Sequence, residues 1–238
     1  MLYITGDTHG EISRFMYADS VIDRTLTDSD KLVIAGDFGY VFEDSYRERR
    51  YLDFLAQKPY QILFVDGNHE NFELLDGYPV EEWCGGKVHV IRRDLEGTPK
   101  IIHLMRGQVF TIESKRIFTF GGAYSVDRYM RTPYRTWWPQ ELPNDEEMRE
   151  AVVNLQMVNN CVDYIVTHTG SEYVMKRLYG GIEAKEKPLV NFLEWVRENV
   201  RFTHWFMGHH HKECDVTPDM TILWFRLRNM VTGEIIEE

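Results

Sequence analysis

The sequence predicts an α/β protein in which two mixed β-sheets lie face to face and helices flank them, an α/β/β/α sandwich. Two observations favour this class. Short apolar runs alternate with segments of helical periodicity near both ends of the chain, and closely spaced β-type runs fill the middle. At 238 residues with 43% hydrophobic content, the chain can bury a substantial core. We therefore expect a single domain over residues 1–238.

The first third of the chain predicts two successive β-α-β units. Strands and helices are expected in alternation at residues 2–6, 12–26, 32–36, 45–57 and 61–66. The interval from Asp7 to Asp37 and that from Asp37 to Asn68 are each close to the ~30 residues of one such unit. A parallel arrangement of these three strands follows.

The rest of the chain continues with shorter elements. Four β-type runs at 87–91, 101–105, 108–112 and 115–120 predict a second, more antiparallel sheet. Helices are expected at 145–160, capped by Asn144, and at 189–200 after Pro188, with a strand at 162–167 between them. Closing strands are expected at 213–217, 220–225 and 230–236. Together these runs supply the second half of the sandwich.

Composition bounds the setting of the protein. The net charge of −11 disfavours a strong nucleic-acid surface. Apolar runs stay well short of the ~20 residues that span a bilayer, and the first residues carry no basic segment typical of a signal peptide. Three cysteines without Cys-x-x-Cys spacing argue against a disulfide framework and a zinc knuckle. We expect a cytoplasmic protein without a membrane partner; the oligomeric state stays open.

Five apolar runs each end in a turn that carries a side chain of the kind that binds metal ions. In chain order these side chains are Asp7 and His9, Asp37, Asn68 and His69, His168, and His209, His210 and His211. The carboxyl ends of parallel strands form one edge of a sheet, so these residues are expected to converge. Ordinary turn chemistry explains any single Gly-Asp or Gly-Asn pair. Agreement among five turns favours a shared metal site.

The donor types also indicate which metals would bind. A carboxylate with two oxygens can bridge two cations ~3.5 to 4 Å apart, and neutral imidazoles fill the other positions without cancelling the charge of the metals. Aspartate, asparagine and histidine without cysteine suit Mn²⁺, Fe or Zn²⁺. The donor set does not choose among these metals, and we take Mn²⁺ as the first candidate. We expect two divalent ions per chain.

The ordered motifs resemble those of the calcineurin-like metallophosphoesterase superfamily, in particular its small bacterial and phage-type members. The motifs are Asp7-x-His9, Gly36-Asp37, Gly67-Asn68-His69-Glu70, His168 and Gly208-His209-x-His211. The resemblance implies one metal held by Asp7, His9, Asp37 and His211, and another held by Asp37, Asn68, His168 and His209. Asp37 would then bridge the two metals, and Asn68 would also touch the substrate.

The resemblance also implies hydrolysis of a phosphate monoester or diester by a hydroxide that bridges the metals. His69 would protonate the leaving oxygen, because an imidazole pKa lies near operating pH. The sequence departs from the family in one place. The large phosphatases extend the second motif to Gly-Asp-x-x-Asp-Arg, whereas Gly36-Asp37-Phe38-Gly39 leads here into Tyr40-Val41. The group that orients His69 is therefore undetermined; Glu70, Glu43 and Asp44 are candidates.

A substitute for the missing arginine is expected in residues 121–143, which we call the lid segment. It contains Arg128, Arg131 and Arg135 among tyrosines and tryptophans. Arginine forks grip phosphate oxygens, and aromatic rings stack on a base or sugar. The alternative is a surface loop whose aromatics pack in the core and whose arginines pair with Asp127 and Glu141. Under the first interpretation the three arginines bind substrate, Arg131 foremost.

The remaining histidines are expected to have structural roles. His210 would project away from its two neighbours in an extended segment, either supporting a ligand or lying at the surface. His89, His103 and His204 lie within apolar runs and are expected to be packed. The favoured substrate is a phosphorylated small molecule or nucleotide-like ester, because the aromatic lid segment would cramp a folded protein. A non-catalytic metal-binding scaffold of the same fold is the alternative function.

Overall fold

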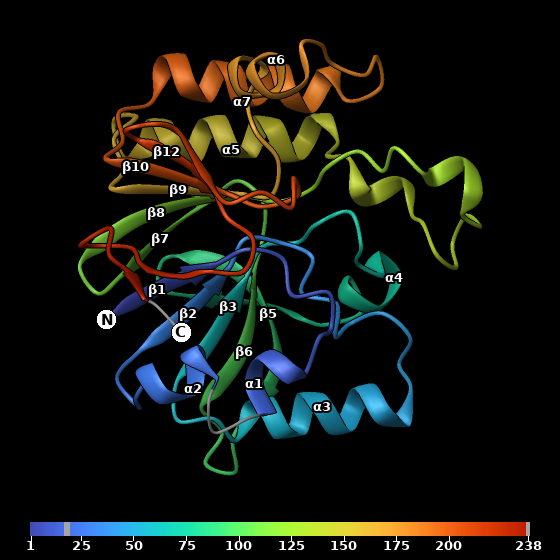
Figure 1. Cartoon of the computed structure of the whole chain (residues 1–238), viewed down its shortest axis with the longest axis vertical. Helices are drawn as coiled ribbons and strands as arrows, with labels where there is room; N and C mark the ends of the chain where they lie inside the picture. The colour runs from blue at the N-terminus through green and yellow to red at the C-terminus, as the bar shows by residue number, and fades with distance from the viewer. Residues whose placement is uncertain (17–19, 237–238) are drawn as a thin grey trace.

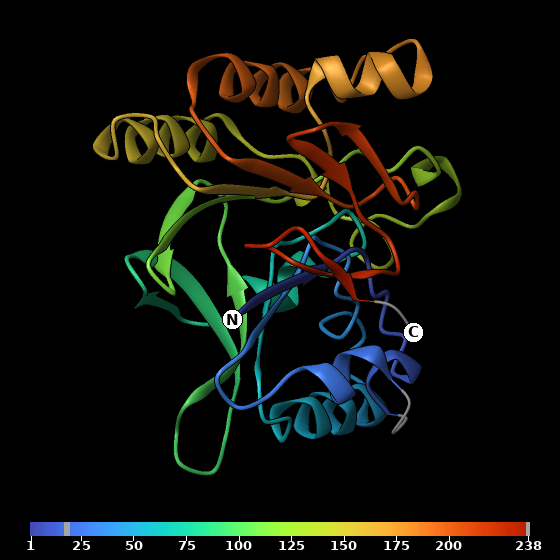
Figure 2. The same ribbon diagram turned by 60° about the vertical axis from the view of Figure 1, so that its left-hand side comes forward.

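The computed structural model describes residues 1–16 and 20–236, and its layers run helix, sheet, sheet, helix (Figure 1). An eight-stranded sheet and a six-stranded sheet face each other, and the helices lie on the two outer faces, as the turned view in Figure 2 also shows. The expected α/β class with two mixed sheets flanked by helices is confirmed.

The eight-stranded sheet carries the N-terminal β-α-β units. Its strands, in spatial order, are β14 (Ile235–Ile236), β13 (Leu227–Asn229), β1 (Leu2–Thr5), β2 (Lys31–Ile34), β3 (Gln61–Phe64), β6 (Pro99–Leu104), β5 (Gly86–Arg93) and β4 (Val80–Trp83). The four central strands β1, β2, β3 and β6 are parallel. Layers cover both faces of these strands, and every residue of β1 is buried. Their sequences are therefore continuous apolar runs.

The six-stranded sheet is also parallel at its centre. Its order is β11 (Cys214–Thr217), β12 (Met220–Ile222), β10 (His204–Met207), β9 (Tyr164–Thr167), β8 (Lys115–Phe120) and β7 (Gln108–Ile112). Strands β9 and β10 run in parallel register, with His204 opposite Tyr164 and Met207 opposite Thr167. Both strands therefore end at the same edge of this sheet.

Three apolar cores hold the layers together. Between the sheets, Leu2 and Val33 of one pack with Val166 and Phe206 of the other. A second core lies under the N-terminal helices, and a third lies between the six-stranded sheet and the later helices. Each sheet is thus buried on both faces, which fixes the position of its strand ends.

The described helices are α1 (Ser13–Met16), α2 (Val21–Thr25), α3 (Tyr46–Ala56), α4 (Phe72–Leu75), α5 (Asp145–Met157), α6 (Glu172–Tyr179) and α7 (Lys187–Asn199). Side-chain caps begin three of the described helices, α3, α4 and α5. The Ser45 hydroxyl accepts from the Glu48 amide at the start of α3. Asn144 and Glu147 form a complete capping box at the start of α5, as the expected cap implied.

The expected single helix at 12–26 is wrong. Ser20 has φ −59° and ψ 123°, which is not helical, and it precedes a new helix, α2. A serine favours such a cap position because its side chain competes for backbone hydrogen bonds. The segment therefore contains α1 and α2, and residues 17–19 of the expected helix lie outside the described part of the chain. Helix α7 begins at Lys187, two residues before the expected start, with Pro188 inside its first turn.

The prediction that the four middle runs form a second sheet is wrong for two of the four. Strands β5 and β6 belong to the eight-stranded sheet, where β6 pairs parallel with β3, and only β7 and β8 belong to the other. The chain crosses between the sheets at Gly107, whose φ of +74° permits the sharp turn. The last expected strand, at 230–236, is mostly a turn. Strand β13 ends at Asn229, a turn with Gly233 follows β13, and within the expected range only Ile235–Ile236 is a strand.

The lid segment leaves β8 and extends beyond the sheets on the side of α4 (Figure 1). It contains two short 3-10 helices, Arg128–Met130 and Pro139–Glu141. Among the described residues, every helix is too short or too polar to cross a bilayer.

Candidate metal centre

The five expected strands end at one place between the two sheets. Strands β1, β2 and β3 bring their turns from one sheet, and β9 and β10 bring theirs from the other. Contacts across the sheets join the turns: the His209 amide donates to Asp7 Oδ1 at 2.9 Å, and His168 Nδ1 donates to the Ala35 carbonyl at 2.8 Å. Side chains far apart in sequence are thus placed together.

Asp7, His9 and His211 form one group of potential ligands. Their donor atoms lie within 4.8 Å of one another. His211 Nε2 is 3.2 Å from Asp7 Oδ2, His9 Nε2 is 3.7 Å from the same oxygen, and the two Nε2 atoms are 3.0 Å apart. Two imidazoles around one buried carboxylate supply part of a suitable coordination shell for a divalent cation.

Asp7, Asp37 and His168 form a second group within the same 4.8 Å limit. His168 Nε2 lies 3.4 Å from Asp37 Oδ2 and 3.1 Å from Asn68 Oδ1. Asp37 Oδ2 is also 3.7 Å from His9 Nε2. Asp7 is common to both groups, whereas this one oxygen of Asp37 lies near an imidazole of each. Bridging by Asp37 stays a prediction that this position supports.

His209 lies next to the second group. Its ring centroid is 5.0 Å from that of His168, at 63° between the ring planes. Burial and the neighbouring His168 lower the pKa of His209 well below its usual range. A neutral imidazole is the form that binds a metal. Its ligand role stays a prediction.

The electrostatics of the turns favour a positive charge. Burial opposes a charged imidazole, but the carboxylates of Asp37 and Asp7 outweigh burial and raise the pKa of His168 to about 10. Burial also disfavours the charged form of Asp37 and by itself would raise the pKa of this carboxyl. The charge of His168 outweighs burial and holds the pKa of Asp37 well below the ordinary carboxyl range. Two buried carboxylates therefore demand a cation among them, which fits divalent metals.

Backbone geometry also fits a site built for ligands. His9, Asp37, His209 and His211 all have φ between 46° and 65°, a region that costs free energy for residues other than glycine. A Cβ on Gly36 would lie 2.0 Å from His168 Nδ1. These turns thus hold strained residues at the point where the candidate ligands meet, a pattern typical of functional sites.

His69 is the next residue after Asn68, and the lid segment reaches it. Arg131 Nη1 and Nη2 lie 3.1 Å and 2.9 Å from Nδ1 and Nε2 of His69, and Arg131 Nη2 also donates to Asp127 at 2.9 Å. The ring of His69 is 5.1 Å from that of His9. Burial lowers the pKa of His69, Asp37 opposes this, and Arg131 adds to the lowering. Arg131 therefore occupies the position beside His69 that the sequence left open.

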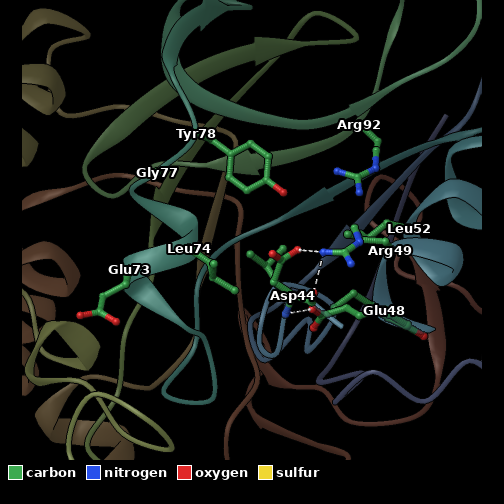
Figure 3. Close-up of a pocket in the computed structure, with 11 residues that line it drawn as sticks. Asp44, Glu48, Arg49, Leu52, Glu73, Leu74, Gly77, Tyr78 and Arg92 are labelled. Carbon is green, nitrogen blue, oxygen red and sulfur yellow. Dashed lines mark hydrogen bonds and ion pairs between the residues drawn. The ribbon is translucent and has the colours of Figure 1, made fainter. Parts of the chain in front are cut away.

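Two of the three candidate supports of His69, Glu70 and Asp44, have other partners. Glu70 Oε1 accepts from the Phe38 amide at 2.7 Å. Figure 3 shows Asp44 facing Arg49, whose Nη1 donates to its Oδ1 at 2.8 Å. Glu43 lines the same cavity as His69, so its side chain stays a candidate support. The cavity in Figure 3, about 280 Å³, has no candidate metal ligand in its lining.

The pairing of Arg131 with Asp127 is a contact that the loop interpretation expected, and substrate binding by the three arginines stays a prediction. Arg131 reaches the site, whereas Arg128 stacks on Tyr124 and Trp137, with its guanidinium carbon 4.6 Å and 5.3 Å from the ring centroids, and Arg135 is exposed. Trp138 is buried against Phe42 at the base of the segment, as the loop interpretation expected.

The segment around His210 is not extended, so the condition for an outward projection is not met. The left-handed residues on either side of it turn the chain, and His210 is buried, with Nδ1 3.2 Å from the Tyr179 hydroxyl. Its Nε2 is buried without a hydrogen-bond partner among the described residues. His89 and His103 are packed as expected and lie 3.2 Å apart between their Nδ1 atoms.

Three contacts at the site were not anticipated from the sequence. The Ser125 hydroxyl accepts from Asn68 Nδ2 at 3.0 Å. Trp224 stacks on His211 with 5.5 Å between ring centroids and 4° between planes. Arg14 Nη1 donates to the Asp7 carbonyl at 2.7 Å. Each residue lies outside the ligand motifs, so spacing gives no signal for it. These contacts orient the candidate ligands.

No model of a known protein family matches the chain, and no curated protein matches it. Solved structures of similar chain path include a protein provisionally assigned as a 5′-nucleotidase from Staphylococcus aureus, in complex with α-ketoglutarate. It has 14% identity and a TM-score of 0.47, over 100% of this chain and 52% of that one. This chain therefore spans about half the length of that protein.

Two further structures are similar in the same way. Phosphopantetheinyl hydrolase from Mycobacterium tuberculosis has 15% identity, 94% and 87% coverage of the two chains and a TM-score of 0.46. Sulfate thiohydrolase from Thermus thermophilus has 14% identity, 87% and 37% coverage and a TM-score of 0.41. At such low similarity, the geometry of the site is the basis for inferring function.

Proposed function

We propose that the chain is a metal-dependent phosphoesterase that hydrolyses a phosphate monoester or diester. The observation that carries the proposal is the meeting of the ligand turns of β1, β2, β3, β9 and β10 around the buried carboxylates of Asp7 and Asp37. Three further features suit phosphate: a positive charge from Arg131, an imidazole from His69, and donor atoms without cysteine.

Seven residues would hold two divalent ions. One ion would take Asp7, His9, Asp37 and His211, and the other would take Asp37, Asn68, His168 and His209. Such ions, with Mn²⁺ the foremost candidate and Fe or Zn²⁺ next, polarise phosphoryl oxygens and lower the pKa of a water molecule toward neutrality. Hydrogen bonds that His168 donates to the Ala35 carbonyl and that Asn68 donates to the Ser125 hydroxyl would keep both side chains oriented.

The remaining residues of the site act directly on the substrate. His69 would donate a proton to the leaving oxygen, because its ring adjoins the ligand turn without belonging to either ligand group. Arg131 would grip the phosphate with its planar fork. Its contact with His69 at 2.9 Å, next to the ligand turn of Asn68, supports this role. Residues 121–143 would form a lid on a single domain.

A small phosphorylated molecule suits this lid segment best. Tyr129 and Tyr134 expose large parts of their rings, so they are available for stacking on a planar group such as a base. Asn68 would contact the same substrate. The base of the lid segment is anchored, because Arg106 Nη2 donates to the Gln140 carbonyl at 2.8 Å. Large movements needed to admit a folded protein are therefore disfavoured.

One experiment separates an enzyme from a binding scaffold. Metal-stripped protein would be reloaded with Mn²⁺, Fe²⁺ or Zn²⁺ and assayed with p-nitrophenyl phosphate and bis-p-nitrophenyl phosphate. Hydrolysis that requires metal, and that Asp37→Asn abolishes in folded protein, supports the proposal. Metal binding without hydrolysis of either ester, or of a panel of phosphorylated metabolites, would support the scaffold instead.

A further inference from the structure

Two cavities flank the candidate metal centre, and they differ in character. The larger, about 640 Å³, is lined by His209 and His211. The smaller, about 280 Å³, is lined by His9 and His69. His9 lines the smaller cavity and His211 the larger, and their Nε2 atoms are 3.0 Å apart, so both cavities adjoin the same ligand group. A substrate held at the centre thus has two cavities next to it.

The larger cavity suits an uncharged and largely apolar group. Val126 of the lid segment, Met175 and Tyr179 of α6, and Ile182 form its apolar wall. The acidic side chains in its lining, Glu183 and Glu186, oppose an anion, and among the described residues its lining contains no lysine or arginine.

His210 is a buried polar residue of this lining. His210 is 8% exposed, and its Nε2 is buried without a partner among the described residues. Its Nδ1 is occupied by the Tyr179 hydroxyl at 3.2 Å. The rings of Tyr124, Tyr179 and His210 all belong to this lining, and aromatic rings pack favourably on one another. An aromatic or heterocyclic group therefore fits better than an alkyl chain.

The smaller cavity is polar and contains His69. Arg47, Glu43 and Ser45 from the turn before α3 and its first residues share its lining with His69. A proton donor must lie within hydrogen-bond reach of the leaving oxygen. The departing alcohol therefore belongs on the side of His69. A monoester has only this one organic group, and it would leave the larger cavity without an occupant.

We propose that the substrate is a phosphodiester whose leaving alcohol lies beside His69 and whose retained alcohol, uncharged and largely apolar, lies in the cavity formed by Val126, Tyr179 and Ile182. The inference rests on the proposed phosphoesterase function. In the reaction, a bond forms from a water oxygen to phosphorus, and the bond from phosphorus to the leaving oxygen breaks with its electron pair on that oxygen. His69 gives this oxygen a proton, and a proton from the water restores His69 through solvent. The products are one alcohol and the phosphate monoester of the retained alcohol.

The test holds the leaving group constant and varies the retained group. Metal-loaded protein would be assayed with p-nitrophenyl methyl phosphate and p-nitrophenyl phenyl phosphate, both of which release p-nitrophenol. We expect kcat/KM for the phenyl ester to exceed that for the methyl ester about tenfold or more, because the ring leaves water for the apolar wall. Ile182→Glu should lower this ratio at least fivefold. Val231→Glu, an equally drastic change at an exposed valine far from the ligand turns in sequence, should leave the ratio as in the parent.

A binding measurement does not depend on turnover. Calorimetry would compare phenylphosphonate with methylphosphonate, whose carbon–phosphorus bonds are not hydrolysed. Tighter binding of phenylphosphonate in the parent, lost in Ile182→Glu, supports the inference. A phenyl-to-methyl ratio near one in both measurements, or p-nitrophenyl phosphate exceeding both diesters in kcat/KM, would overturn the inference and leave the phosphoesterase function standing. Failure to hydrolyse any ester would instead overturn the proposed function and this inference with it.

Discussion

The guanidinium of Arg131 lies 3.1 Å and 2.9 Å from the two ring nitrogens of His69, although 62 residues separate them. Asp127 holds the same guanidinium from the other side at 2.9 Å. This contact joins the lid segment to the turn after β3. It also gives the site a fixed positive charge next to the proposed proton donor, where the second ligand motif offers no arginine.

Replacement of Arg131 should weaken the use of substrate. We expect Arg131→Ala to raise KM or lower kcat/KM by about 1.5 to 3 kcal/mol, the range for a hydrogen bond to a charged group. Arg131→Lys should recover only part of the loss, because an ammonium lacks the planar fork. The matched control is Arg135→Ala, since Arg135 is exposed in the same segment. Steady-state kinetics that show no difference between Arg131→Ala and Arg135→Ala would remove Arg131 from the substrate site.

His69 should matter for chemistry and not for metal content. We expect His69→Ala to keep both ions and to lower kcat by about 10² to 10⁴, the usual range for a lost general acid. The loss should be smaller for a p-nitrophenyl ester than for an alkyl ester, because a good leaving group departs without protonation. Elemental analysis and kinetics on both esters check this. Equal losses for the two esters would show that His69 acts in another way.

Asp37 should be the ligand whose loss is felt most. Its Oδ2 lies 3.4 Å from His168 Nε2 and 3.7 Å from His9 Nε2, so one oxygen faces both ligand groups. We expect Asp37→Asn to lower metal content and activity more than His211→Ala, because it removes charge from both groups. Asp7→Asn is the informative comparison, since Asp7 belongs to both donor groups. A larger loss in Asp7→Asn would transfer the bridging role to Asp7.

Gly36 should tolerate no side chain. A Cβ there would approach His168 Nδ1 to 2.0 Å, and φ at Gly36 is +98°. We expect Gly36→Ala to displace His168, to lower metal affinity and to lower the melting temperature. Gly97→Ala is the matched control, because Gly97 has a φ of +88° and nothing within 4 Å of its added Cβ. Backbone strain alone would cost about 1 to 3 kcal/mol in both variants. If both variants keep parental metal affinity, the position of His168 does not depend on the absence of a side chain at Gly36.

The ligand turns were predictable because the signals are local. Each apolar run is a strand buried on both faces, and each is followed at once by Gly-Asp, Gly-Asn or a histidine turn. The sheet to which β5 and β6 belong was not predictable in the same way. Their antiparallel pairing to each other is compatible with either sheet, and the pairing of β6 with β3 is a long-range contact.

The lid segment, too, could be predicted only in part. The cluster of arginines was visible in the sequence. Which of these arginines reaches the ligand turns depends on how the neighbouring side chains pack. Arg128 stacks on Tyr124 and Trp137 and is thereby removed from the ligand turns. The direction of His210 could not be predicted, because it depends on the positive φ angles of His209 and His211, which turn the segment. Residues such as Ser125 and Trp224 carry no motif and emerge only from three-dimensional contacts.

The measurement that tests the account most directly is activity as a function of bound metal. Metal-stripped protein would be titrated with Mn²⁺, with bound ion counted by elemental analysis and hydrolysis of a p-nitrophenyl ester followed at each point. We expect activity to be negligible without metal and to reach its maximum at two ions per chain, and we expect Asp37→Asn to remain inactive at the same Mn²⁺ concentrations. Full activity in stripped protein, or a maximum at one ion per chain, would contradict a two-metal site built on Asp7 and Asp37.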